Sequence, residues 1–184
     1  GGYARSGLLS DVELIEEAPT RYDADVQRRH RWIRGDWQLL GWLLPQLRLR
    51  PPGGGRRIVR PNPLSALARW KIADNLRRSL VPAALTLLFV LGWLLLASPA
   101  LWTGAGLAML FVPAALGFAG ELLRKPDEVQ LGPHLSATVP SLLRQLGQAG
   151  VALATLPHEA RFSLDAIGRT LWRLSFSRRR LLEW

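Results

Sequence analysis

The stretch LVPAALTLLFVLGWLLLA (residues 80–97) contains no charged side chain, and it decides the fold class of this chain. A second uncharged run, residues 100–120, follows directly after Ser98-Pro99. Each run is close to the roughly 20 residues that a helix needs to cross the hydrocarbon core of a bilayer. Because their connection is so short, the two runs predict a transmembrane hairpin over residues 80–120. The alternative, a buried helical hairpin of a soluble protein, seldom stays uncharged for so long.

Basic residues flank this predicted hairpin on both outer sides. Arg77 and Arg78 precede the first run, and Arg124 and Lys125 follow the second. The excess of Lys and Arg in cytoplasmic loops of membrane proteins then places both outer ends in the cytoplasm. The sequence therefore predicts a multi-pass membrane protein whose polar flanking segments lie on the cytoplasmic side.

The chain as a whole is strongly basic. Its 184 residues include 24 Lys and Arg against 14 Asp and Glu, which gives a formal net charge of +10. Such a charge attracts nucleic acid, anionic lipid headgroups or a nucleotide-linked substrate. A soluble nucleic-acid-binding protein does not explain the two apolar runs, so we expect a lipid bilayer and no nucleic acid as partner. The sequence contains no cysteine, and its three histidines are too widely spaced for a local metal motif.

The segment before the hairpin predicts a helix over residues 25–43. Asp23 and Asp25 stand where acidic side chains cap a helix and complement its dipole, and Pro45 stands where a helix ends. Asp23-Ala24-Asp25 also spells the D-x-D motif of metal-dependent glycosyltransferases, but the position before a helix favours capping. Residues 11–17 alternate enough to indicate a short edge strand.

This predicted helix carries a basic and aromatic stretch, QRRHRWIRGDWQ, at residues 27–38. Arginine donates in a planar, bidentate manner to phosphate oxygens, and indole faces are platforms for ring-shaped ligands. Helical spacing places Arg28, Arg31 or Trp32, and Gly35 on one face, where an anion and a sugar could bind together. The other interpretation is a solvated basic helix whose tryptophans fill a core or mark a membrane surface, and His30 is equally compatible with both.

The remaining segments are assigned from breakers and periodicity. We predict that residues 1–47 end a cytoplasmic domain, that 48–63 form a loop without regular structure, and that 64–79 form an interfacial amphipathic helix. After the hairpin we predict a cytoplasmic loop over 121–140. The last part, 141–184, would contain a third membrane or interfacial helix at 141–156 and a basic amphipathic helix at 160–173. Arg178, Arg179 and Arg180 would then bind anionic lipid.

Several blocks of the sequence resemble one enzyme family. Arg28-Arg29-His30-Arg31-Trp32 is similar to the Q/R-x-x-R-W motif of membrane-integrated processive glycosyltransferases of family 2. The likeness is closer to the cyclic β-1,2-glucan synthases, glycosyltransferase family 84. The blocks that resemble that family in order and spacing are Ser10 to Leu14, Arg28 to Gln38, Asn62 to Ser65, Arg69 to Ser79, and Leu171 to Leu174.

The resemblance implies a very large enzyme of the bacterial inner membrane that polymerises glucose from UDP-glucose into cyclic β-1,2-glucan with inversion at the anomeric carbon. It implies that Arg28 and Arg31 neutralise the leaving diphosphate and that Trp32 stacks under the acceptor glucose. Asp36 and Trp37 complete the substrate-binding set that we expect. Mg or Mn would serve the full-length enzyme, with the metal ligands, the uridine-binding strands and the general base all before Gly1.

We therefore expect a fragment, inactive alone, that is mainly α and integral to the membrane. It would comprise the C-terminal end of a GT-A-like glycosyltransferase domain followed by interfacial and transmembrane helices, with UDP-glucose, a glucan acceptor, lipid and the remaining domains of the same chain as partners. One rival is another processive polysaccharide synthase, cellulose-like or hyaluronan-like. A second is a non-enzymatic membrane anchor or scaffold whose arginines bind headgroups and whose tryptophans lie at the interface.

Overall fold

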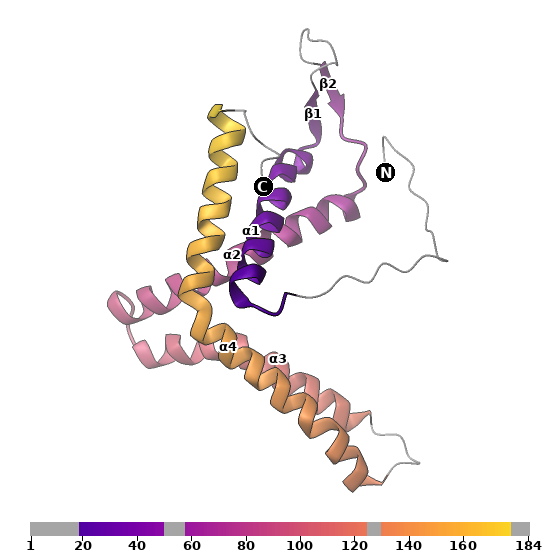
Figure 1. Cartoon of the computed structure of the whole chain (residues 1–184), viewed down its shortest axis with the longest axis vertical. Coiled ribbons are helices and arrows are strands. Elements are labelled where there is room, and N and C mark those ends of the chain that lie inside the picture. The colour runs from indigo at the N-terminus through magenta and orange to yellow at the C-terminus, as the bar shows by residue number, and fades with distance from the viewer. Residues whose placement is uncertain (1–18, 50–57, 125–129, 178–184) are drawn as a thin grey trace. The chain divides into compact units, whose positions relative to one another are not determined.

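The computed structural model describes residues 19–49, 58–124 and 130–177, and it is mainly helical (Figure 1). The predicted α class is therefore confirmed, whereas the predicted strand at 11–17 and the arginine cluster at 178–180 lie outside the described residues. In chain order the elements are α1 (Tyr22–Gln38), the 3-10 helix η1 (Leu39–Leu43), β1 (Gln46–Leu49), β2 (Ile58–Pro61), α2 (Ala66–Leu94), α3 (Pro99–Leu123), α4 (Leu131–Trp172) and a π-helical turn, η2 (Arg173–Ser177).

The chain divides into two compact units. The first, here called the basic unit, comprises residues 1–80 and 162–184. The second, here called the apolar unit, comprises residues 81–161.

In the basic unit, α1 begins three residues earlier than predicted and changes helix type near its end. Its N-cap is Arg21, which makes no side-chain capping hydrogen bond. The predicted capping by Asp23 and Asp25 is therefore wrong, because both carboxylates bind arginines instead. They still lie in the first turn, where negative charge complements the helix dipole. After Gln38 the backbone tightens into η1, and the extended residue Leu44 leads into Pro45, as expected before a proline.

A short antiparallel hairpin follows η1. Gln46 pairs with Pro61 and Leu49 pairs with Ile58. The prediction that residues 48–63 lack regular structure is wrong at both ends of that range, where β1 and β2 form. Asn62 holds the hairpin to η1, because its Nδ2 donates to the Trp42 carbonyl at 2.6 Å and to the Leu44 carbonyl at 2.8 Å.

In the apolar unit, α2 and α3 approach closely through small residues. A Cβ added at Gly92 would lie 2.7 Å from the Trp102 Cβ, and one added at Gly106 would lie 2.5 Å from Cζ of Phe89. Glycine is needed at such positions because any side chain would push the helices apart. Near the turn between α2 and α3, Trp93 Nε1 donates a hydrogen bond to Thr103 Oγ1 at 2.8 Å and so links the two helices.

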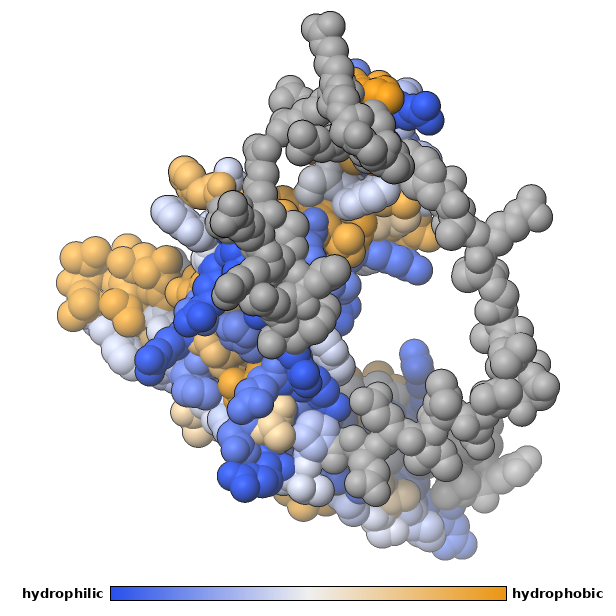
Figure 2. Space-filling view, turned by 45° about the horizontal axis from the view of Figure 1, so that its top comes forward, coloured by the Kyte–Doolittle hydropathy of each residue, from blue (hydrophilic) through white to orange (hydrophobic). Residues whose placement is uncertain are grey.

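Among the described helices, α2 and α3 are long and apolar enough to cross a membrane. Only 28% and 11% of their most apolar windows are buried among the described residues. Large apolar side chains are exposed at the turn between them, which forms the orange patch on the left of Figure 2; they include Trp93, Leu94, Leu95 and Leu101. The predicted interfacial helix at 64–79 and the first predicted span are one continuous helix.

Helix α4 differs most from the sequence prediction. It runs unbroken for 42 residues, so the predicted loop is wrong for residues 131–140, and the predicted break near Pro157 is absent. It is not among the helices that are apolar enough to span a membrane, so the third predicted span is not supported. The helix continues past Pro157 because the residues around it, Leu156 and Ala160, are buried, and packing outweighs the one backbone hydrogen bond that proline removes.

Candidate functional site

The predicted substrate-binding residues lie on two different parts of the α1 surface. Arg28, Arg31 and Trp32 lie within one turn of each other, whereas Asp36 and Trp37 contact the part of α2 that belongs to the basic unit. The structure thus brings together three of the five residues and separates two.

The contact between Arg28 and Trp32 is direct. The Arg28 guanidinium carbon lies 4.9 Å from the centroid of the Trp32 ring, which is a cation–π distance. Asp25 Oδ1 also accepts a hydrogen bond from the Arg28 guanidinium at 2.9 Å. Trp32 is 59% exposed, so most of its indole surface remains accessible to a ligand while its neighbour holds the side chain in place.

Arg31 lies one turn from Arg28 and is exposed. Together with Gln27, His30, Arg34 and Val26 it lines a cavity of about 360 Å³ along α1. Two guanidinium groups and an indole therefore occupy adjacent positions on one helix. This arrangement can bind an anion through charge-assisted hydrogen bonds and a flat ring through stacking.

Arg34 is the one cation of this stretch that is buried, with 8% exposure. Burial lowers its pKa first of all, and the nearby charges of Arg173 and Arg169 lower that pKa further while Asp165 opposes them. The guanidinium remains protonated at neutral pH, because arginine is not deprotonated in proteins. Sequence reasoning missed its burial, since a run of arginines does not indicate which one points inward.

Asp36 and Trp37 pack α1 against α2. Trp37 Nε1 donates to Ser79 Oγ at 2.9 Å, and that hydroxyl donates onward to the Leu76 carbonyl at 2.7 Å. Burial raises the pKa of the Asp36 carboxyl, and a hydrogen bond from the Asn75 side chain partly counteracts this. In this structure the two residues fix the orientation of α1.

A third part of the α1 surface is held by the last turns of α4. His30 Nε2 lies 3.0 Å from Asp165 Oδ2, and Arg169 lies 2.7 Å from the same oxygen. The Arg169 hydrogen bond, and after it that of His30, hold the pKa of Asp165 below its usual range. The Arg29 guanidinium lies 5.2 Å from the Phe162 ring centroid. Because α1 is held at all these points, the exposed Arg31 and Trp32 and the half-buried Arg28 are presented on a fixed helix.

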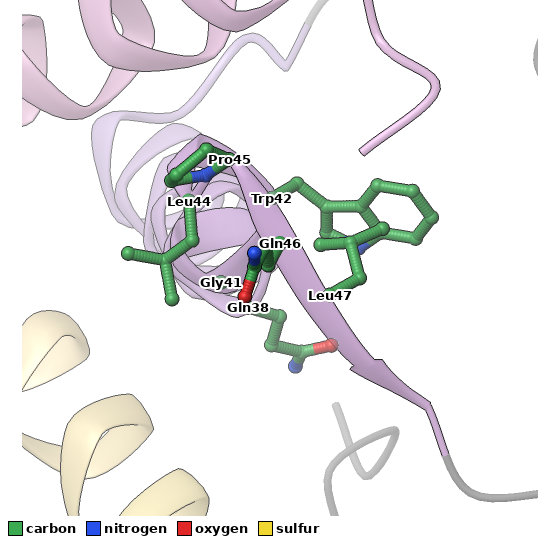
Figure 3. A pocket seen from close by; sticks show the side chains of 7 residues that line it. All are labelled: Gln38, Gly41, Trp42, Leu44, Pro45, Gln46 and Leu47. Atoms are coloured by element: carbon green, nitrogen blue, oxygen red, sulfur yellow. The ribbon is translucent and has the colours of Figure 1, made fainter. Parts of the chain in front are cut away.

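A larger pocket of about 650 Å³ lies where α1 gives way to η1 and β1 (Figure 3). The sequence predicts only the end of a helix there, before Pro45. The described residues that line it are Gln38, Gly41, Trp42, Leu44, Pro45, Gln46 and Leu47.

The described residues do not fit a divalent metal site. Among residues 19–49, 58–124 and 130–177, no group of three or more carboxylates or histidines is arranged to hold an ion. Asp23 binds Arg21 at 3.0 Å, and Asp25 binds both Arg28 and Arg29 at 2.9 Å. The two carboxylates of the D-x-D sequence therefore bind arginines in this structure. The expected Mg or Mn ligands are not found among the described residues.

Fold and site together define a class: a helical segment that combines two apolar helices of membrane length with a helix that carries arginines and an exposed indole on its surface. Comparison with known proteins then shows which protein this chain is similar to. Over its whole length the chain is 36% identical, across 186 aligned residues, to cyclic beta-(1,2)-glucan synthase NdvB of Rhizobium meliloti (strain 1021). No family model matches the chain.

The chain spans 6% of the length of that relative. The resemblance to cyclic β-1,2-glucan synthases that the sequence blocks indicate is confirmed over the full chain. The chain is homologous to one segment of such a synthase.

Proposed function

We propose that this chain is part of a membrane-bound inverting glucosyltransferase that polymerises glucose from UDP-glucose into cyclic β-1,2-glucan. Within that enzyme, Arg28, Arg31 and Trp32 form its diphosphate- and acceptor-binding surface. The observation that carries the proposal is the exposed indole of Trp32, held by the half-buried Arg28 guanidinium and lying beside the exposed Arg31, in a chain that is homologous along its whole length to a segment of a glucan synthase.

The proposed chemistry needs positive charge where a leaving group becomes more anionic. An acceptor hydroxyl oxygen forms a bond to the anomeric carbon of UDP-glucose, and the bond from that carbon to the β-phosphate oxygen breaks with inversion. UDP leaves with the bonding electron pair, and the hydroxyl proton passes to a general base in another part of the enzyme. Arg28 and Arg31 stabilise the departing diphosphate because they are fixed before the charge develops. Trp32 holds the acceptor sugar against its indole face, which places the hydroxyl near the reacting carbon.

The membrane part of the proposal rests on α2 and α3. Their length, apolar composition and low burial suit a hairpin in the bilayer of the bacterial inner membrane. With the basic residues outside both apolar runs, α1 and its arginines lie on the cytoplasmic side, where UDP-glucose is available. The other parts of the full-length enzyme would supply a GT-A-like catalytic domain with the metal and nucleotide ligands.

The test is substitution in the full-length synthase, assayed in membranes for UDP release and glucan formation. Arg31→Ala and Trp32→Ala should each lower turnover by about 100-fold or more, the scale of losing a preorganised transition-state contact. Arg21→Ala, which removes an exposed arginine at the start of the same helix, and Trp70→Ala, which removes an exposed indole on α2, are the matched controls.

Both controls should retain turnover, and all four variants should insert in the membrane at the wild-type level. A non-enzymatic anchor predicts the reverse: normal turnover in the Arg31 and Trp32 variants with weaker membrane association. That result would overturn the proposal.

A further inference from the structure

The pocket at the C-terminal end of α1, which Gln38 lines, lies on the same side of the helix as Arg31. Gln38 follows Arg31 by seven positions, or nearly two full turns, so both residues lie on the same stripe of α1. The rise of an α-helix puts them about 10 Å apart along the axis. Gln27, Arg31 and Arg34 line the cavity at one end of this stripe, and Gln38 lines the pocket at the other.

The two cavities differ in the chemistry of their walls. Three of the described residues around the Arg31 cavity are basic, His30 included. The described lining of the Gln38 pocket is uncharged: it combines one indole, two carboxamides, three aliphatic side chains and Gly41. Figure 3 shows Trp42 and Leu47 on one side and Leu44 and Pro45 on the other, with the carboxamides of Gln38 and Gln46 between them in this view.

This lining suits a neutral, hydroxyl-rich ligand with apolar ring faces. An indole packs against the C–H faces of a sugar ring, while carboxamides offer both donors and acceptors to hydroxyl groups. A diphosphate would find no cation among the described lining residues, and it would be bound better by the Arg28 and Arg31 side chains.

The backbone of the pocket is held in place before any ligand binds. Asn62 ties down the carbonyls of Trp42 and Leu44, and its own N–H donates to the Pro45 carbonyl at 2.9 Å. Leu47 is buried at the base of β1. A pocket of about 650 Å³ with fixed walls is within the range of sites that bind small ligands without rearrangement.

We propose that the pocket formed by Gln38, Trp42 and Gln46 binds the growing neutral glucan, a few sugar units away from the end that is held at Trp32. The inference rests on the proposed function and adds a second, uncharged acceptor subsite to it. The glucan then runs along the stripe of α1 from the arginine surface to the η1 pocket. Binding there retains the product between additions and favours long chains over short ones.

The test fills the pocket without disturbing its walls. Gly41 lines the pocket and a Cβ added there meets nothing within 4 Å, so the side chain of Gly41→Leu starts in open space at the pocket. Gly168→Leu on α4 is the matched control, because its Cβ also meets nothing within 4 Å and it lines neither cavity. Full-length synthase in nanodiscs is assayed with a soluble β-1,2-gluco-oligosaccharide for acceptor KM, UDP-glucose KM and product length.

Gly41→Leu should raise the acceptor KM by about tenfold, the effect of losing one good contact, and shorten the products, with the KM for UDP-glucose unchanged. Trp42→Phe keeps an aromatic wall and should give an intermediate shift. Gly168→Leu should match the wild type. An unchanged acceptor KM and unchanged product length in Gly41→Leu, while Arg31→Ala still abolishes turnover, would overturn the pocket assignment and leave the proposed function standing.

A lipid occupant is distinguished in the same experiment. If Gly41→Leu alters the dependence of activity on nanodisc lipid composition but not the acceptor KM, the pocket binds lipid and the glucan assignment is wrong. If Arg31→Ala and Trp32→Ala leave turnover intact, the proposed function itself fails.

Discussion

The two units of this chain differ in the side chains that make their internal contacts: these are mostly apolar in one unit and polar or charged in the other. Helices α2 and α4 contribute residues to both units. In the apolar unit, Leu85, Phe89 and Leu156 form a small cluster of buried apolar side chains, while many large apolar side chains remain exposed. In the basic unit, α1 is held to its neighbours by hydrogen bonds and ion pairs from Trp37, His30 and Asp36.

This difference shows which interaction each unit depends on. Lipid is as apolar as leucine, so helices of a membrane hairpin associate through close packing at small residues rather than through burial of apolar surface. A helix in water that must expose arginines and an indole to a ligand cannot bury them, and polar contacts on its other faces hold it. The apolar unit should therefore fail when its close contacts are filled, and the basic unit when its polar contacts are removed.

The largest effect is expected at the contact between α2 and α3. In Gly92→Ala the new Cβ would lie 2.7 Å from the Trp102 Cβ, which cannot move without its backbone, so the helices must separate. Overpacking of this kind costs about 1–3 kcal/mol. Hydrogen exchange of α2 and α3 amides in the reconstituted full-length protein should show a matching loss of protection.

Gly104→Ala is the control for that experiment, because its Cβ meets nothing within 4 Å. It should leave exchange unchanged or slower. Equal exchange in the two variants would mean that α2 and α3 do not depend on close packing at Gly92, and the contrast between the units would lose its main support.

The next largest effect is expected in the basic unit, at Trp37. Trp37→Phe keeps a ring but removes the N–H that donates to Ser79, and a hydrogen bond contributes about 0.5–1.5 kcal/mol. Exchange of α1 amides should quicken accordingly. A double-mutant cycle with Ser79→Ala should show coupling of similar size. If Trp37→Phe instead lowers turnover with α1 exchange unchanged, Trp37 acts on substrate, as the sequence alone predicts.

The same contrast explains what the sequence could reveal. The two long apolar helices, α2 and α3, are predictable because an uncharged run of about 20 residues is a local signal. The pairing of Arg28 with Trp32 is also local, since residues four apart on a helix are neighbours. The inward contacts of Asp36 and Trp37 depend on which side of α1 receives α2, and that partner lies about 40 residues along the chain.

The errors in the predicted fold also arise from contacts between residues that are far apart in the sequence. The glycines and prolines of residues 51–63 predict a loop. The strands β1 and β2 form because Gln46 pairs with Pro61 and because Asn62 donates hydrogen bonds to η1 and its C-cap, and neither contact is visible in the local sequence. Pro157 predicts a break, and burial of its neighbours maintains α4. The pocket at Trp42 also requires the turn at Pro45 to bring β1 beside η1, which no local pattern specifies.

A smaller effect, with a distinctive pH dependence, is expected at Asp36. Burial raises the pKa of its carboxyl in the folded state above the unfolded value of about 4. The packing of α1 is then strongest below that value, weakens as the pH rises through the folded pKa, and stays weaker at neutral pH. Asp36→Asn should remove this decline and protect α1 amides better than the wild type at pH 7. Poorer protection at pH 7 would show that the charged hydrogen bond with Asn75 outweighs the cost of burial.

The smallest effect is expected at Asp165, and its pH dependence has the opposite sign. Arg169 first, and then His30, hold the pKa of this carboxyl in the folded state below its ordinary value near 4. The stabilisation is therefore complete above that value and is lost as the pH falls through the lowered folded pKa. Asp165→Asn should reduce acid sensitivity and cost less than about 1 kcal/mol at pH 7, because the ion pair is partly exposed. Arg169→Gln should reproduce most of this change and His30→Asn less of it. The reverse order would make the contact between α1 and α4, rather than the pair within α4, the chief source of the stabilisation.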